Sequence, residues 1–442
     1  MTTPNPSLQL LGKKIIFSTL IQYVWRALQI VLAAFTIKII SNFLTTSNYG
    51  VYATITEYAL FFSVVANLGI FAHVIRRMSV NPTDGKTFIN ALYLRILTAV
   101  IFFVFGLIFL VWMGSNILFI ICTAIFFWVL LLDFMTSVCD GMLQANYMMG
   151  RATFALIIGR IFALAALYGV IQFIGQSLAL AGNFSGIILI LSSLVIGSLV
   201  TFLLSYYFVT KKIQLHWNID TDFMWNIFKA GLPFGIINII NSLYFRFLPD
   251  YFSHLALTDT QFATFSISFR IAQILSLLST FLMFSALPGI REYIDQKHWH
   301  KVRTLYSKIV LVLTSAGIWV VIFGSLLGPK MLTLVTHERY FLPEFWFVLP
   351  LMLLLAAISY GYDLILITLF AFDKTRWLLS REFFALTIAL FFFISSLFIE
   401  NNTQLRILFV ILWAIAGEGI MVVAGFLKMR KILNTIGLEV QE

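Results

Sequence analysis

The stretch NALYLRILTAVIFFVFGLIFLVWM, residues 90–113, contains a single charged side chain, Arg95. A helix of about 20 mainly apolar residues is long enough to cross the hydrocarbon core of a bilayer. Similar runs recur along all 442 residues, of which 61% are hydrophobic and 11% charged, and a soluble domain could not bury that much apolar surface. We therefore predict an all-α polytopic membrane protein rather than a β-barrel, which would show short alternating segments.

The apolar runs predict about twelve transmembrane helices joined by short connections. The first run is too long for a signal-peptide core and is followed by no small-residue cleavage site, so we expect it to remain as a span. The connection at 210–229 divides the spans six and six, which predicts an N-terminal lobe at 1–209 and a C-terminal lobe at 230–442. The expected spans are 15–44, 49–72, 90–113, 115–140, 152–175, 184–209, 230–250, 262–288, 305–328, 345–371, 378–399 and 403–427.

The basic residues predict the orientation of these spans. Of the 29 Lys and Arg residues, seven fall within spans and only three, Lys330, Arg339 and Arg406, lie opposite the N-terminus, so 19 lie on the N-terminal side. Lys and Arg accumulate on the cytoplasmic side of membrane proteins, which predicts that both termini are cytoplasmic. The connection 210–229 also carries Trp217 and Trp225 among lysines, so it is either an amphipathic segment on the membrane surface or a plain linker.

No motif for soluble-type catalysis is present. The chain has no Walker loop, no HExxH, no GxSxG and no cluster of Cys and His, and its two cysteines, Cys122 and Cys139, fit small buried hydrophobes. The net charge of +10 is spread over many loops rather than gathered in one patch. We therefore expect no enzymatic activity, no cofactor or metal, and no binding of nucleic acid.

Four ionisable residues fall deep within apolar runs: Arg26, Glu57, Arg246 and Arg270. A charge at the bilayer centre costs about 2.5–3.5 kcal/mol on insertion scales, so such residues usually face water or protein and serve a function. Intramembrane ion pairs are the alternative, but one Glu cannot neutralise three Arg. The surplus positive charge predicts an anionic ligand, and the forked donors of arginine fit a phosphate or pyrophosphate.

Polar neighbours extend these charges into stripes on one face of each helix. Residues spaced i, i+4 and i+7 or i+8 share a helical face, and three such sets predict one hydrophilic cavity. The sets are Gln22, Arg26 and Gln29, then Asn238, Ser242 and Arg246, and then Ser266, Arg270 and Gln273. With the four ionisable residues, these neighbours form the predicted substrate site, in which the amides could contact sugar hydroxyls. The amides are Gln22, Asn238, Asn241 and Gln273.

Three further acids, Asp133, Asp363 and Glu418, lie within spans nearer the cytoplasmic ends. They are candidates for coupling to H⁺ or Na⁺, and pairing with nearby arginines is the alternative. The basic residues Arg95, Arg160 and Lys308 begin inner-leaflet segments, so we expect them to extend to the headgroups unless they have a function.

An internal repeat relates the two halves. At an offset of 213, YGVYATITE (49–57) overlays FATFSISFR (262–270), and LYLRILTAV (92–100) overlays LYSKIVLVL (305–313). The repeat places Glu57 opposite Arg270. Repeated halves in transporters place the substrate site between them, although chance similarity of apolar sequence is the alternative.

Several segments resemble the multidrug/oligosaccharidyl-lipid/polysaccharide flippase superfamily, in its Wzx-type polysaccharide-exporter branch. Residues 48–70 are similar to its second helix, 228–252 with Gly231-Leu232-Pro233 to its seventh, 262–290 to its eighth, and THERYFLPE (336–344) to its segment before helix ten. The chain departs from the family at Asn42, where Arg is frequent, and at Asn67, where Asp is common. We assign neither position a role that depends on charge.

The resemblance implies a fold similar to that of MATE transporters, with two pseudo-symmetric lobes around a cavity lined by helices 1, 2, 7 and 8. It implies transport of undecaprenyl-pyrophosphate-linked oligosaccharide, such as O-antigen or capsule repeat units, across the bacterial inner membrane by alternating access. Polymerases and glycosyltransferases of the same pathway are the implied protein partners. A cation or drug antiporter of the same superfamily and a membrane polymerase or ligase remain as alternatives.

Overall fold

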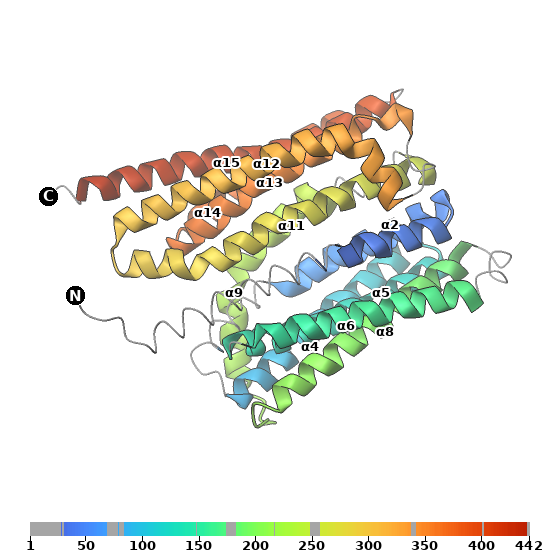
Figure 1. Ribbon diagram of the computed structural model, residues 1–442, viewed down its shortest axis with the longest axis horizontal. Coiled ribbons are helices and arrows are strands. Elements are labelled where there is room, and N and C mark those ends of the chain that lie inside the picture. Colours follow the sequence, from blue (N-terminus) through green and yellow to red (C-terminus); the bar gives the residue numbers. More distant parts are fainter. Residues whose placement is uncertain are drawn as a thin grey trace. The chain divides into compact units, whose positions relative to one another are not determined.

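The computed structural model describes residues 28, 31–68, 78, 84–146, 148–173, 183–215, 217–247, 257–336, 342–399 and 402–439. Every regular element in these ranges is helical (Figure 1). The elements are α2 (Thr46–Asn67), α4 (Gly85–Trp112), α5 (Ile117–Ala145), α6 (Met149–Phe173), α8 (Asn183–Thr210), α9 (Thr221–Ser242), the π-helical turn η1 (Leu243–Phe247), α11 (Asp259–Asp295), α12 (Trp299–Val335), the 3-10 turn η3 (Pro343–Phe345), α13 (Val348–Ala371), α14 (Thr375–Leu397) and α15 (Thr403–Glu439).

Ten helices in the described residues are long and apolar enough to cross a membrane. An eleventh candidate is the bent pair Thr221–Pro233 and Gly235–Phe245, whose axes differ by 47°. Proline lacks the N–H of the helical ladder and its ring crowds the preceding turn, which accounts for the bend. The prediction of an all-α multi-span membrane protein is therefore confirmed. Of the first expected span, 15–44, the described part forms the short apolar helix Val31–Phe43.

The chain divides into two compact units. Of the described residues, the first unit contains those up to Leu44 and Phe62–Gly235, and the second contains Thr45–Phe61 and Ile236–Glu442. The division therefore falls inside α2 and inside α9, close to the bend at Pro233. The segment expected as a linker at 210–229 is helical from Thr221 onward.

In the first unit, α5 packs against α4, α6 and α8, and α6 packs closely on α8. The α6–α8 contact depends on Gly159 and Gly197, because a Cβ on Gly159 would lie 2.6 Å from the carbonyl oxygen of Gly197. Small residues of this kind let transmembrane helices approach through their backbones. The stacked rings of Phe103 and Phe127, 4.4 Å apart, fill the contact between α4 and α5.

In the second unit, α13 is the central helix and packs against α11, α12 and α15, while α14 packs on α15. These helices run alongside one another in Figure 1. The helix starts agree with the repeat seen in the sequence. Helix α11 begins at Asp259, 213 residues after α2 begins at Thr46, and α12 begins at Trp299, 214 residues after α4 begins at Gly85.

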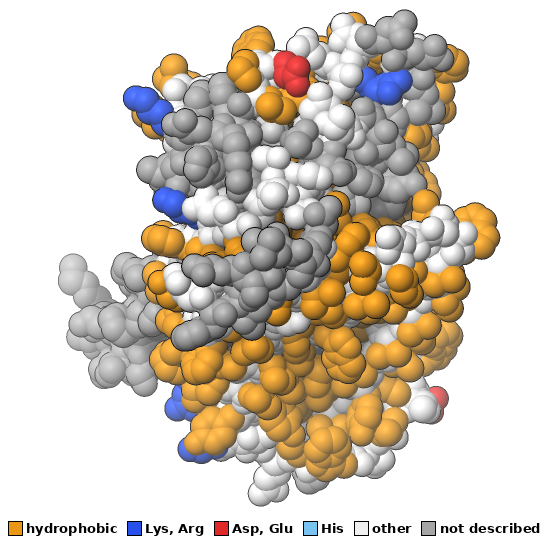
Figure 2. Space-filling view, turned by 90° about the vertical axis from the view of Figure 1, so that its right-hand side faces the viewer, with side chains coloured by type: hydrophobic (Ala, Val, Ile, Leu, Met, Phe, Trp, Pro, Cys, Tyr) orange, Lys and Arg blue, Asp and Glu red, His pale blue; other side chains and the backbone are white. Residues whose placement is uncertain are grey.

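Charged side chains are unevenly distributed. In the lower part of the face drawn in Figure 2, the described side chains are mainly hydrophobic and few are charged. Basic side chains are instead frequent around the turn from α11 to α12, with Lys297 and Lys301, and the turn from α13 to α14, with Lys374 and Arg376.

Candidate functional site

Arg270 lies in the second unit, where α11 faces the first half of α2. Its guanidinium donates hydrogen bonds to the hydroxyl oxygens of Thr56 and Tyr52. The Arg270 Cζ atom also lies 5.0 Å from the ring centroid of Tyr52 and 5.8 Å from that of Tyr49. Glu57, which is 4% exposed, is close enough to interact with the charge. Neutral hydroxyls and aromatic rings are therefore the direct partners of this cation.

The spacing along α2 explains how this helix receives Arg270. Tyr49, Tyr52 and Thr56 follow at i, i+3 and i+7, so they share one helical face. The Thr56 hydroxyl donates its own hydrogen to the carbonyl oxygens of Tyr52 and Ala53, at 3.0 and 2.9 Å. Its oxygen lone pairs are thereby turned away from the helix axis and accept from Arg270.

Three buried polar atoms along α11 have no hydrogen-bond partner among the described residues: Ser266 Oγ, Arg270 Nε and Gln273 Nε2. They belong to the i, i+4, i+7 stripe that the sequence predicts. A buried donor without a partner costs about 1–3 kcal/mol, so proteins seldom retain one without a reason. Two nitrogen donors and a hydroxyl on one helical face are suited to binding an oxyanion.

A second polar cluster in the same unit is built from acids. Both carboxylate oxygens of Glu382 in α14 accept hydrogen bonds, from Tyr244 in η1 at 2.9 Å and from Tyr362 in α13 at 2.7 Å. Asn241 in α9 donates to the Tyr244 hydroxyl at 2.9 Å and is also hydrogen-bonded to Glu418 in α15. We call these five residues, with Ser359, which donates to Glu418 at 2.6 Å, the acid network.

The chain matches the family described as polysaccharide biosynthesis protein over residues 11–294. The chain belongs to this family. None of the curated protein sequences matches it.

Solved structures establish the fold of this polysaccharide biosynthesis protein. An inward-facing multidrug resistance MATE transporter of the MOP superfamily matches with a TM-score of 0.67 and 14% identity over 91% of this chain and 95% of that one. A MATE protein in the bent conformation matches with 0.65 and 15% identity over 100% of both. A MOP superfamily transporter from Pyrococcus furiosus, whose description reports a binding pocket of reversed polarity, matches with 0.63 and 14% identity over 97% and 95%. The expected MATE-like fold is confirmed.

The other residues of the predicted substrate site do not all lie beside Arg270 in the described structure of this family member. Arg26 and Gln22 lie outside the described residues. Arg246 falls in η1, but its side chain is not among those described. Asn238 is half-buried in α9, and Asn241 belongs to the acid network rather than to the Arg270 site. The structure thus brings Arg270 and Glu57 close enough to interact, with Gln273 one turn along α11 from Arg270, whereas the hydrogen-bond partners of Asn241 are Tyr244 and Glu418.

The predicted ion-coupling acids have mostly neutral partners. Asp363 accepts from Ser279 and Thr280 at 2.5 and 2.7 Å, and Glu418 from Ser359. Neither is paired with Lys or Arg in the described residues. In the first unit, Asp133 accepts from Ser198 at 2.9 Å and lies near Arg160. The alternative that these acids pair with nearby arginines therefore has support only at Asp133.

Sequence reasoning missed Glu382 and Asp140. Glu382 directly follows Arg381 near the start of α14, and it therefore resembled a paired residue at the membrane surface. Asp140 accepts a hydrogen bond from Ser205 at 3.3 Å, and both residues lie seven positions after the pair Asp133 and Ser198. The same Asp–Ser spacing thus occurs twice between α5 and α8, and it could have indicated the contact of Asp140 from the sequence.

The expectation that Arg95 reaches the headgroups is wrong. Arg95 is 2% exposed, donates to Asn67 Oδ1 at 2.7 Å, and its Cζ lies 4.8 Å from the ring centroid of Phe134. Its side chain is therefore a structural element of the first unit, where Asn67 and an aromatic face stabilise it. Arg160 and Lys308 are exposed.

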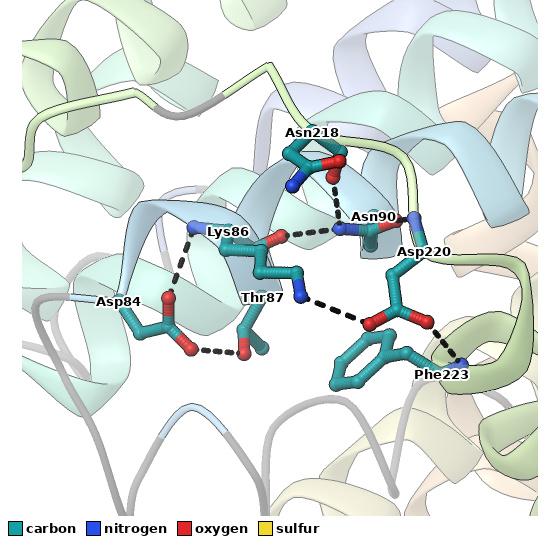
Figure 3. A network of polar contacts seen from close by, with 7 residues as sticks. All are labelled: Asp84, Lys86, Thr87, Asn90, Asn218, Asp220 and Phe223. Carbon is teal, nitrogen blue, oxygen red and sulfur yellow. Dashed lines mark hydrogen bonds and ion pairs between the residues drawn. The ribbon is translucent and has the colours of Figure 1, made fainter.

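A third polar cluster in this protein, the α4–α9 clasp, joins the beginnings of α4 and α9 in the first unit (Figure 3). Lys86 Nζ lies 2.9 Å from Asp220 Oδ2, and Asn90 binds the backbone at both Asn218 and Asp220. Asp220 also caps α9 by accepting from the Phe223 N–H at 2.9 Å. The hydrogen bonds from the Phe223 backbone and from Lys86 hold the pKa of Asp220 below its ordinary value.

Proposed function

We propose that this protein is a flippase that moves undecaprenyl-pyrophosphate-linked oligosaccharide repeat units across the cytoplasmic membrane by alternating access. The family supports a role in polysaccharide biosynthesis, and the fold is that of MOP-superfamily transporters. O-antigen or capsule units are the substrates that the family resemblance suggests. A cation or drug antiporter and a membrane polymerase or ligase are the alternatives that experiments must separate.

The observation that carries this proposal is the environment of Arg270. Its guanidinium is bound by hydroxyls and aromatic rings, and its Nε is buried without a partner among the described residues. In a low-dielectric setting such a cation attracts an anion strongly. A pyrophosphate can occupy the remaining donor together with Gln273 and Ser266, and the binding offsets the cost of bringing its charge into the membrane. Arg26, Arg246, Gln22 and Asn238 complete the proposed cationic site.

The proposal also includes the orientation of the chain in the membrane, the coupling ions and the protein partners. The distribution of Lys and Arg supports cytoplasmic termini in a bacterial inner membrane. Asp133, Asp363 and Glu418, each of which accepts a hydrogen bond from a neutral hydroxyl group, are the proposed sites of coupling to H⁺ or Na⁺. Glycosyltransferases that build the lipid-linked unit and a polymerase that consumes it are the proposed partners.

The test is flipping of a lipid-linked oligosaccharide in proteoliposomes containing the full chain. Arg270→Ala is expected to reduce flipping at least tenfold, and Arg270→Lys to restore only part of it, because an ammonium cannot make the forked contact. Lys308→Ala is the matched control, since it removes an exposed positive charge from another helix of the same unit. Equal flipping by wild type and Arg270→Ala would contradict the cationic site.

A deletion strain distinguishes the alternatives. Loss of a flippase leaves complete lipid-linked units on the inner leaflet, whereas loss of a polymerase or ligase leaves them on the outer leaflet. An antiporter would show export of cationic compounds that depends on this chain and no change in lipid-linked units. Accumulation on the outer leaflet would therefore reject the proposal.

A further inference from the structure

The π-helical turn η1 contacts its neighbours in the second unit through the buried side chain of Tyr244 and through Phe245, whose ring centroid lies 6.0 Å from that of Phe269. The Tyr244 side chain is 0% exposed, and its hydroxyl both accepts from Asn241 and donates to Glu382, each at 2.9 Å. Its ring lies against Gly417 in α15 so closely that a Cβ there would be 2.6 Å from a ring carbon. Tyr244 is therefore the polar and close-packed anchor of η1.

Glu382, the acid that binds Tyr244, is itself completely buried. Its ionisable neighbours are Tyr244 from η1, Tyr362 from α13 and Glu418 from α15. On its own helix the adjacent Arg381 is exposed, with its guanidinium carbon 5.7 Å from the ring centroid of Trp377. No Lys or Arg is paired with Glu382 among the described residues.

The hydrogen bonds at Glu382 fit the ionised carboxylate. Two tyrosine hydroxyls donate, one to each carboxylate oxygen. A protonated carboxyl carries a hydrogen on one oxygen, and that oxygen becomes a donor. Binding of one proton therefore removes the negative charge that both tyrosine hydroxyls contact, and it weakens the hydrogen bond to the oxygen that carries the proton.

The π-helical form of η1 gives such a change a structural consequence. A π turn contains one more residue per hydrogen-bonded ring than an α turn, and such turns are rare and often lie at functional sites. Conversion to α-helical bonding shifts the register by one residue, which is about 100° around the helix axis. Arg246 lies in this turn, two residues after Tyr244.

We propose that Glu382, acting through Tyr244, holds η1 in its π-helical form, and that protonation of Glu382 releases the turn and reorients residue 246. Glu382 and Tyr244 are positioning residues in this scheme, and the proton is the ligand. The inference rests on the proposed function in one respect, because Arg246 belongs to the proposed cationic site. It links the protonation of a buried acid to the backbone conformation of the turn that contains residue 246.

Hydrogen exchange of the full chain in nanodiscs tests the link without any substrate. The measured quantity is the exchange rate of the amides of η1, corrected for the intrinsic effect of pH. In the wild type we expect faster exchange at pH 5 than at pH 8. Tyr244→Phe removes the contact and is expected to speed exchange at least tenfold at pH 8, because a hydrogen bond to a charged group is lost.

Tyr362→Phe is the matched control. It removes the same kind of hydroxyl from the same carboxylate, but it lies on α13 and not in η1. Exchange in η1 should change less than twofold. Glu382→Gln imitates the protonated acid, so its η1 amides should exchange rapidly and equally at both pH values. Equal exchange in Tyr244→Phe and Tyr362→Phe, or exchange in the wild type that does not depend on pH, would overturn the proposal.

Transport measurements separate this inference from the proposed function. If the wild type flips lipid-linked oligosaccharide with a pH profile that Glu382→Gln flattens and Tyr362→Phe retains, both are supported. Flipping with an unchanged pH profile in Glu382→Gln rejects the inference alone. If the wild type flips no such lipid while exchange follows the expected pattern, the substrate proposal fails and the link between Glu382 and η1 stands.

Discussion

Lys86, in the first turn of α4, and Asp220, the residue before α9, form an ion pair with 2.9 Å between Nζ and Oδ2. Their separation in sequence is 134 residues. Together with Asn90, this pair fixes the beginning of α9 on the first unit, ahead of the bend at Pro233. The α4–α9 clasp therefore holds the beginning of α9 within the first unit.

Asp220→Asn tests the α4–α9 clasp through pH. Because the pKa of Asp220 is lowered in the folded protein, the stability that it contributes is present above about pH 4, the ordinary pKa of aspartate, and is lost as the pH falls further. We expect a lower Tm for the variant at pH 7 and convergence with the wild type near pH 3. Asp222→Asn, at an exposed position in the first turn of α9, is the control. An equal difference at both pH values would contradict the assignment.

Gly85→Ala should destabilise the first unit by about 1–3 kcal/mol, the usual range for overpacking. A Cβ at this position would lie 1.9 Å from the carbonyl oxygen of Gln214, and backbone cannot move aside as a flexible side chain does. Gly150→Ala in α6 is the matched control, because nothing lies within 4 Å of its added Cβ. The check is thermal unfolding of both variants in detergent. A Tm for Gly85→Ala equal to that of Gly150→Ala would show that the segment near Gln214 does not pack as described.

Asn67→Ala should cost about 1.5–3 kcal/mol, because Asn67 Oδ1 accepts a hydrogen bond from the buried charge of Arg95. Asn67→Asp should instead raise the Tm, since it replaces a neutral acceptor by an anion next to the guanidinium. The paired measurement of both variants by thermal unfolding distinguishes a hydrogen-bonding role from mere space filling. If both variants lose stability equally, the contact with Arg95 is not what Asn67 contributes.

The fold was largely predictable from the sequence, because long apolar runs specify membrane helices almost by length alone. The stripe Ser266, Arg270 and Gln273 was also readable, since helical spacing determines which side chains share a face. The residues that contact Arg270 could not be predicted from the sequence. Thr56 and Tyr52 meet Arg270 through packing across more than 200 residues of sequence, and nothing local marks them.

The burial of individual charges was the least predictable feature. Arg95 and Glu382 both lie near the beginning of a helix, where a charged side chain can ordinarily reach water. In the structure, each is turned inward and satisfied by neutral groups on other helices. Position along a span therefore did not determine exposure, because the neighbouring helices supplied the polar partners.

The sharing of α2 between the units limits how the gene can be recombined. Tyr49, Tyr52 and Thr56 are encoded in the first half of the sequence, yet they pack with Arg270 in the second unit. A chimera of two relatives joined at the central connection would exchange one side of this contact and keep the other. A functional chimera should therefore need residues 45–61 and the C-terminal half from the same parent, although these two segments are far apart in the sequence.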